Sequence, residues 1–249
     1  GATCSNYTYQ PLYPIDNQGL YVVVYDNTGT TSIERYNYGS SSFQTIYSSS
    51  YYIGSTAMTT NYLVVSTSNP SNSNYSILAI AKNGSSSNTI YSGTNLSYIQ
   101  LFSSSNEVFI NLVGQGSSTS ACIWIEGSST LSCTPNAYWL GPDYASSGTF
   151  NISADTMTLY KMLEYNSGSL YAVDPNSLSA YQLGNVPQNV FIHGFGIGNN
   201  ILLTGFTPFT NSSTNYIFFA NTSQANSLIT SYTSNQFLEP IVPGEIGLE

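Results

Sequence analysis

Residues 169–184 read Ser169-Leu-Tyr-Ala-Val-Asp-Pro-Asn-Ser-Leu-Ser-Ala-Tyr-Gln-Leu-Gly184 and contain two strand-like runs separated by a polar turn. The first run is apolar and includes residues that favour strands. The turn holds Asp, Pro, Asn and Ser, which dominate turns for stereochemical reasons. The stretch therefore predicts a β-hairpin with one buried strand and one shorter, more polar strand.

The same hairpin pattern recurs five times, at starts separated by roughly 43 to 48 residues. The longer strands cover residues 32–39, 75–82, 121–126, 169–174 and 215–220, and the shorter ones cover 43–47, 88–91, 130–133, 178–183 and 228–232. Apolar strands precede the hairpins at 20–25, 62–65, 108–113, 157–162 and 201–204. Short strands precede four of those apolar strands, at 52–56, 97–102, 137–141 and 190–195.

Four strands in a unit of about 45 residues are typical of β-propeller blades. The sequence thus predicts an all-β fold, a five-bladed β-propeller with four-stranded blades in one domain over residues 20–241. The first unit lacks a fourth strand, so we expect residues 237–241 to supply it and close the ring with a C-terminal strand. A β-sandwich, or two tandem sandwiches, also has short strands at this spacing and stays open as the alternative.

Two resemblances accompany this pattern. Residues 169–184 resemble the outer hairpin of blades in secreted YVTN and quinoprotein-like propellers, while the other repeats match only in pattern. The overall composition, poor in charge and rich in Ser, Asn and Tyr, resembles that of secreted surface proteins of thermoacidophilic archaea. The second resemblance implies an extracellular surface role and carries over no functional residue.

Charge excludes several classes of partner. The chain has 12 acidic and only 3 basic residues, and charged residues make up 6% of it, against about a quarter in a typical soluble domain. Binding to nucleic acid or to an anionic membrane requires Lys and Arg, so neither is expected. No apolar run approaches the roughly 20 residues that span a bilayer, so no membrane-spanning segment is expected.

The ends lie outside the repeat. The first residue is Gly1 rather than Met, so we expect the sequence to begin after a processing site. Residues 1–19 are predicted to form an extended N-terminal arm interrupted by prolines, and residues 242–249 a C-terminal tail. Both hold apolar residues, which suits arms that pack on a neighbouring molecule.

The cysteines indicate an oxidising compartment. Gly127-Ser128 suits a two-residue hairpin turn, and counting outward from it places Cys122 opposite Cys133, within reach of a disulfide. Cys4 is left over, as a free, buried or intermolecular thiol. Two thiols without a nearby His do not make a zinc site, so no metal is expected.

Asn-X-Ser/Thr sequons, the acceptors of N-linked glycans, are frequent in this chain. Each lies beside an apolar strand core, where a glycan can point to solvent. We expect several of them to carry sugar, and the seven are Asn6, Asn74, Asn83, Asn95, Asn151, Asn211 and Asn221.

Catalytic sets are not evident, so neither a catalytic residue nor a cofactor is predicted. The one histidine, His193, more naturally fills an inner-strand position than a Ser-His-Asp triad. Asp143 and Glu239 fall on predicted innermost strands, where two carboxylates can act in glycoside hydrolysis, the enzyme alternative. Tyr138 and Trp139 beside them could stack on a bound glycan, the lectin-like alternative.

The sequence therefore favours an extracellular structural or adhesive protein without catalysis. We expect it to be a subunit or component of a filament, a surface layer or a virion appendage, located at a cell or virion surface. Its partners are expected to be copies of itself or other surface proteins, with glycans as a further class of partner.

Overall fold

The structure, a computed structural model, describes residues 7–12, 19–26, 28–69, 71–116, 118–143, 156–162, 168–186, 191–197, 200–206 and 215–234. Strands are the only regular elements in these residues, so the all-β prediction is confirmed. It follows that this part of the chain contains no helix long and apolar enough to cross a membrane.

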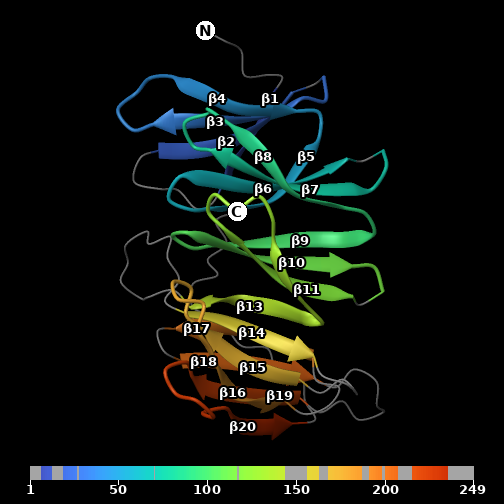
Figure 1. Ribbon diagram of the computed structural model, residues 1–249, viewed down its shortest axis with the longest axis vertical. Helices are drawn as coiled ribbons and strands as arrows, with labels where there is room; N and C mark the ends of the chain where they lie inside the picture. The colour runs from blue at the N-terminus through green and yellow to red at the C-terminus, as the bar shows by residue number, and fades with distance from the viewer. Residues whose placement is uncertain are drawn as a thin grey trace. The chain divides into compact units, whose positions relative to one another are not determined.

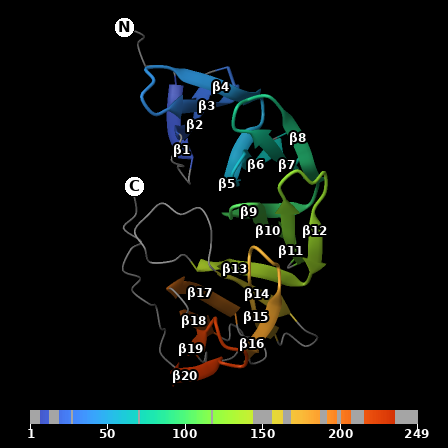
Figure 2. The same ribbon diagram turned by 60° about the vertical axis from the view of Figure 1, so that its left-hand side comes forward.

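The strands form five four-stranded sheets, each built from consecutive strands of the chain (Figures 1 and 2). The first sheet contains β1 (Tyr7–Leu12), β2 (Gly19–Asp26), β3 (Thr31–Asn37) and β4 (Phe43–Ser49). The second contains β5 (Tyr52–Met58), β6 (Tyr62–Asn69), β7 (Asn74–Ala81) and β8 (Ser87–Gly93). The third contains β9 (Leu96–Ser103), β10 (Glu107–Gly114), β11 (Thr119–Ile125) and β12 (Ser132–Pro135).

The last two sheets follow the same plan. The fourth contains β13 (Ala137–Asp143), β14 (Thr156–Met162), β15 (Gly168–Val173) and β16 (Ala180–Val186). The fifth contains β17 (Phe191–Ile197), β18 (Asn200–Phe206), β19 (Asn215–Asn221) and β20 (Ile229–Ser234). Each strand position predicted from the repeat, apart from residues 237–241, is occupied by a strand. Residues 237–249 lie outside the described part of the chain.

The first sheet corrects one prediction. Strand β1 pairs antiparallel with β2 along its whole length, with Tyr7 opposite Asp26 and Leu12 opposite Tyr21. The fourth strand of this sheet therefore comes from residues 7–12, which were expected to be an arm, and not from residues 237–241. Pro11 had argued against a strand, but an edge strand tolerates proline because one of its sides makes no ladder hydrogen bonds.

The chain divides into two compact units. The first unit contains the strands β1 to β12 and strand β13 up to Trp139, and the second contains β13 from Leu140 onward and β14 to β20. The single domain over residues 20–241 stays a prediction.

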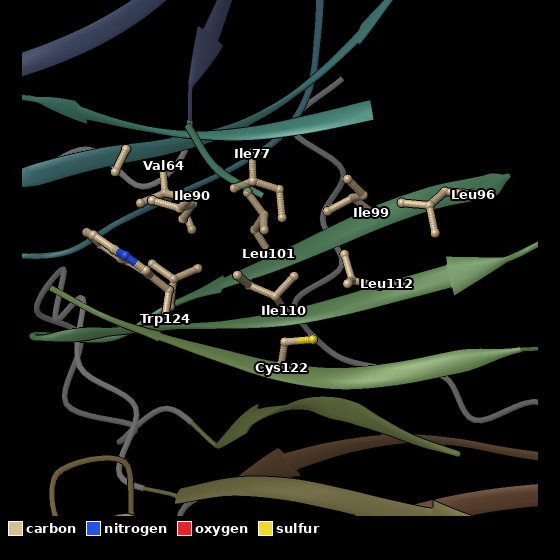
Figure 3. Packing of buried hydrophobic residues seen from close by; sticks show 13 residues of the cluster. Val64, Ile77, Ile90, Leu96, Ile99, Leu101, Ile110, Leu112, Cys122 and Trp124 are labelled. Carbon is tan, nitrogen blue, oxygen red and sulfur yellow. The ribbon is translucent and has the colours of Figure 1, made fainter. Parts of the chain in front are cut away.

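Apolar side chains fill the space between neighbouring sheets of the first unit. One cluster joins the second sheet to the third, and Figure 3 shows Ile77 and Ile90 facing Leu101, Ile110 and Trp124. A second cluster joins the first sheet to the second, through residues such as Ile33, Ile46 and Leu63. Burial of this kind stabilises the fold by roughly 25 cal/mol per Å² of apolar surface.

A β-bulge recurs in the pairing of the outer strands. The register between the third and fourth strands of a sheet shifts by one residue in four of the five sheets. In the first, second and fourth sheets the extra residue of this β-bulge is Ile46, Ile90 and Leu183 respectively, and each is buried. A bulge places two residues of one strand opposite one residue of its partner, which here directs an additional aliphatic side chain into the core.

Polar side chains also join neighbouring sheets. Ser103 Oγ accepts a hydrogen bond from Met58 N at 3.0 Å, and Ser55 Oγ accepts one from Leu101 N at 3.0 Å. Asn111 lies in β10, yet its side chain pairs with the backbone of Trp139 in β13. Asn111 Nδ2 donates to Trp139 O at 2.8 Å, and Trp139 N donates to Asn111 Oδ1 at 2.6 Å. The amide of Asn111 thus replaces a residue of a paired strand.

Candidate functional site

A polar depression of about 420 Å³ lies on the second sheet; we call it the first depression. Two Tyr, three Asn, two Thr, two Ser and one Gly line it. They come from the turn before β5, from the end of β6, from the turn between β6 and β7, from the start of β7, and from the end of β8 with the residue that follows it. None of these lining residues is an acid, a base or a histidine.

Backbone turns orient the amides of this depression. Ser71 N donates to Asn69 Oδ1 at 2.9 Å, and Asn74 N donates to Asn72 Oδ1 at 3.2 Å. Because an amide oxygen accepts while the NH₂ group donates, these contacts assign both side-chain oxygens to the turn. The NH₂ groups of Asn69 and Asn72 have no hydrogen-bond partner in the described part of the chain.

A smaller second depression of about 120 Å³ adjoins the first and shares Thr67 and Tyr75 with it. The hydroxyl of Tyr75 donates to Ser97 O at 3.4 Å, which ties its ring to the next sheet. Tyr51 lines the first depression and is 42% exposed, and Tyr98 lines the second and is 54% exposed. Three tyrosines therefore border the two adjoining depressions.

The predicted glycan-stacking residues do not form this site. Trp139 is 4% exposed, its ring packs edge-on against Phe109 at 4.8 Å between centroids, and its Nε1 donates to Cys122 O at 2.9 Å. It is a core residue, so the prediction that its ring is a stacking platform is wrong. Tyr138, its neighbour, is half-buried.

The described part of the chain includes one of the two carboxylates of the glycosidase alternative, and also the histidine that was expected on an inner strand. Asp143 is the last residue of β13, and His193 lies in β17, opposite Thr204. Glu239 is outside the described residues. The described part of the chain contains no group of three His, Cys, Asp or Glu side chains that could hold a metal ion. The glycosidase alternative stays a hypothesis.

The predicted disulfide is present. Cys122 and Cys133 lie opposite each other in β11 and β12 and are bonded, with their Cα atoms 4.0 Å apart. The predicted turn differs, because Ser128 N donates to Ile125 O, so Glu126 and Gly127 are its central residues. Gly127 has φ of +85°, a conformation that glycine adopts without steric cost. Cys4 lies outside the described residues.

Four of the seven sequons fall in the described part of the chain. Asn74, Asn83 and Asn95 are exposed and Asn221 is half-buried, each at the end of a strand or in a turn. Asn6, Asn151 and Asn211 lie outside the described residues. All four positions suit a glycan that points to solvent, and their modification stays a prediction.

Sequence reasoning missed the residues of the first depression. The sequence feature that could have indicated this depression is the run Asn69-Pro-Ser-Asn-Ser-Asn74, in which three asparagines surround a turn between two strands. A run of this kind is first interpreted as turn chemistry, because Asn, Ser and Pro all favour turns. Only the packing of Tyr51 and Thr94 from other segments makes it the wall of a depression.

No protein-family model and no curated protein matches the chain. Among solved structures it is similar to the β-propeller domain of the Trilobed protease from Pyrococcus furiosus, with a TM-score of 0.51 and 13% identity over 86% of this chain and 69% of that chain. It is also similar to a prolyl endopeptidase, with a TM-score of 0.54 and 8% identity over 92% of this chain. A puromycin-hydrolysing peptidase from Mycobacterium tuberculosis has a TM-score of 0.52 and 10% identity over 97% of this chain.

These similarities support a β-propeller-like fold and nothing finer. This chain spans only 42% and 39% of the lengths of the two peptidases. The domain from Pyrococcus furiosus has an open velcro topology. In the present chain each described sheet consists of four consecutive strands, and residues 7–12 take the place that the predicted C-terminal strand was to fill. The sandwich alternative finds no support.

Proposed function

We propose that this chain is an extracellular, N-glycosylated protein without catalytic activity that works as a component of a surface assembly, with its five sheets acting as the blades of one propeller. The observation that carries the proposal is the sequence of the five outer strands. None of β4, β8, β12, β16 and β20 contains a single Asp, Glu, Lys or Arg residue.

An edge strand presents unpaired N–H and C=O groups to any other chain that approaches. Soluble proteins commonly protect such edges with charged side chains, above all Lys, or with proline. Here Pro135 in β12 is the one proline in the five outer strands, and charge is lacking altogether. Bulges bend four of the strands, but each bulge interrupts the pairing at only one point. These edges therefore suit pairing with another molecule.

Exposed aromatic side chains on the same strands and their turns support the proposal. Phe43 in β4 and Tyr38 in the preceding turn are each more than half exposed, and Phe43 lies 5.5 Å from the ring of Tyr36. Phe219 and Ile229 are exposed and directly opposite each other in β19 and β20. Aromatic residues are enriched in protein interfaces because they bury a large area at low entropic cost.

A charge introduced into an outer strand tests the proposal. Thr89 is an exposed residue of β8, and Thr89→Lys adds a solvated cation to that edge without disturbing the core. Ser50→Lys, in the exposed turn before β5, is the matched control with the same change of charge. Both proteins are compared with the unchanged chain by analytical ultracentrifugation and by electron microscopy of the native surface material.

We expect the unchanged chain and Ser50→Lys to assemble and Thr89→Lys to stay monomeric or form shorter polymers. Assembly of all three to the same extent means that the β8 edge takes no part. A chain that is monomeric both in native material and in vitro overturns the assembly role. Intact mass spectrometry of the native protein tests glycosylation separately, since a mass equal to that of the bare chain contradicts it.

A further inference from the structure

Independently of the assembly role, we propose that the first depression binds an uncharged saccharide. Its volume, about 420 Å³, lies in the range of about 300–1,000 Å³ that is usual for small-molecule sites. Phosphate or carboxylate ligands call for Arg or Lys, and metal ions call for carboxylates or imidazoles. Because the lining has none of these groups and only two aromatic rings, a neutral ligand with many hydroxyl groups matches it best.

Hydrogen-bond donors converge on the depression. The oxygens of Asn69 and Asn72 are already used by backbone N–H groups, so each side chain offers two N–H donors from its NH₂ group. Ser92 and Ser76 lie 3.3 Å apart through their Oγ atoms and can both donate and accept. Sugar hydroxyls accept and donate in the same way, so this set satisfies them without a net charge.

Aromatic faces supply the apolar part of the site. Sugar rings have an apolar face of C–H groups, and aromatic side chains give a large, rigid contact area at low entropic cost. Tyr51 is exposed at the first depression, and Tyr75 is held between the two depressions by its hydrogen bond to Ser97 O. Because Tyr98 borders the adjoining depression, we infer that the site takes an oligosaccharide of at least two units.

The sequon Asn74-Tyr75-Ser76 lies wholly within the lining of the first depression. The same saccharide chemistry can therefore come from two sources. One is an oligosaccharide of another molecule, and the other is a glycan attached to Asn74 itself, whose first sugars would occupy the depression. Both saccharides would occupy the same depression, so a glycan attached to Asn74 would prevent other glycans from binding there.

The first arm of the test uses protein from a host that does not glycosylate. Maltotriose, cellotriose, mannotriose and chitotriose are titrated separately into it and followed by ¹H–¹⁵N NMR and calorimetry. We expect at least one to bind and to shift the amide signals of residues 69, 71–76 and 92–94. Tyr51→Ala is expected to weaken this binding about tenfold, and Asn72→Ala about fivefold. Tyr38→Ala, which removes an exposed tyrosine from the first sheet, is the matched control and should leave the affinity unchanged.

The second arm uses protein from a glycosylating host. Glycopeptide mass spectrometry measures the occupancy of Asn74 and of Asn83, which lies in an exposed turn outside the depression. A peptide N-glycosidase then acts on the native protein. A glycan seated in the depression is expected to leave Asn74 about fivefold more slowly than Asn83, and Tyr51→Ala should remove this difference.

Binding in the first arm identifies an external saccharide as the ligand. Protection of the Asn74 glycan, without binding in the first arm, identifies the chain's own glycan. If no oligosaccharide binds and Asn74 is unmodified or is released as fast as Asn83, the proposal is wrong. The melting temperature of each variant is measured as well. Ser76→Ala serves as a second variant, which removes the sequon and one hydroxyl of the depression but keeps Asn74. These outcomes do not depend on whether the chain assembles.

Discussion

The second and third sheets hold their outer strands by different means. Strand β8 of the second sheet has seven residues and a bulge that buries Ile90, which is 6% exposed. Strand β12 of the third sheet has four residues, and all of them are exposed. Its register with β11 runs without a shift, and the disulfide between Cys122 and Cys133 joins the two strands.

The difference shows that a short outer strand needs one strong anchor. An apolar side chain in the core provides it for β8, while β12 contributes no buried side chain and relies on a covalent bond. Both anchors lie in the first unit, and each holds the outer strand of a β-hairpin. Removing each anchor separately therefore measures the two against each other.

The largest effect is expected from Ile90→Ala. The substitution removes a buried side chain of the core between the second and third sheets, and changes of this type cost about 2–5 kcal/mol of unfolding free energy. Urea denaturation measures the loss. Thr89→Ala changes the exposed neighbour and should cost less than about 0.5 kcal/mol, as surface substitutions usually do. Equal losses for the two variants would mean that the bulge does not anchor β8.

Cys133→Ser is expected to cost up to about 3 kcal/mol, the loop-closure value for a bridge between residues 11 apart. We choose Cys133 because it is exposed, so that the new hydroxyl stays in water. Hydrogen exchange should show faster exchange at the amides of β12 and little change at those of β8. Slow exchange at β12 in this variant would show that its backbone hydrogen bonds suffice. Ser132→Ala, in the same strand, is the control.

Asn111→Ala tests the polar link of the third sheet to β13, with an expected loss of about 1–3 kcal/mol. The change leaves the backbone N–H and C=O of Trp139 without their partner in a buried place. Asn111→Asp keeps an acceptor for Trp139 N–H, but it removes the donor to Trp139 O and Gln100 Oε1 and buries a carboxyl group, so it should also destabilise the protein. Tryptophan fluorescence, to which Trp124 and Trp139 both contribute, should report local loosening before global unfolding. If Asn111→Ala has the same free energy of unfolding as the unchanged protein, water replaces the side-chain amide without a loss of stability.

The smallest effect is expected from acid. Hydrogen bonds from the Thr28 hydroxyl and from Thr30 N lower the pKa of Asp26 below its usual range. A lowered folded-state pKa stabilises the protein above the unfolded value, about 3.9, and this contribution is lost as the pH falls. Because the carboxylate is exposed, we expect only a slight decrease in melting temperature below about pH 4. Asp26→Asn should abolish that decrease, and a large drop in both proteins would contradict the prediction.

Alkali is expected to destabilise the protein as the pH rises. Burial raises the pKa of Tyr25 and of Tyr91, so the folded state favours their neutral phenols. This contribution is complete below the unfolded pKa of about 10 and is lost as the pH rises through the folded values. Above about pH 10 the melting temperature should fall, and Tyr91→Phe should reduce this fall. Unchanged behaviour of Tyr91→Phe would show that this phenol takes no part.

Local pattern predicted much of the fold, because strand alternation and turn residues are encoded in neighbouring positions. The strands from residue 20 to residue 232 and the pairing of Cys122 with Cys133 could be predicted by counting along the chain. The count placed the turn one residue late, at Gly127-Ser128 instead of Glu126-Gly127, because a loop longer than two residues can close the same register. The role of β1 was missed because Pro11 disfavours a strand unless an edge position is available for it.

The sequence by itself determined the strands from residue 20 onward, their order and the disulfide, since these follow from residues close together in the chain. Tertiary structure alone decided that Trp139 is buried, because its burial depends on Phe109 and Asn111 from another strand. It also decided where the first depression lies, since Tyr51, Asn72 and Thr94 come from three separate segments. A depression is a property of surfaces that meet in space, and no periodicity along one segment records which other segments will border it.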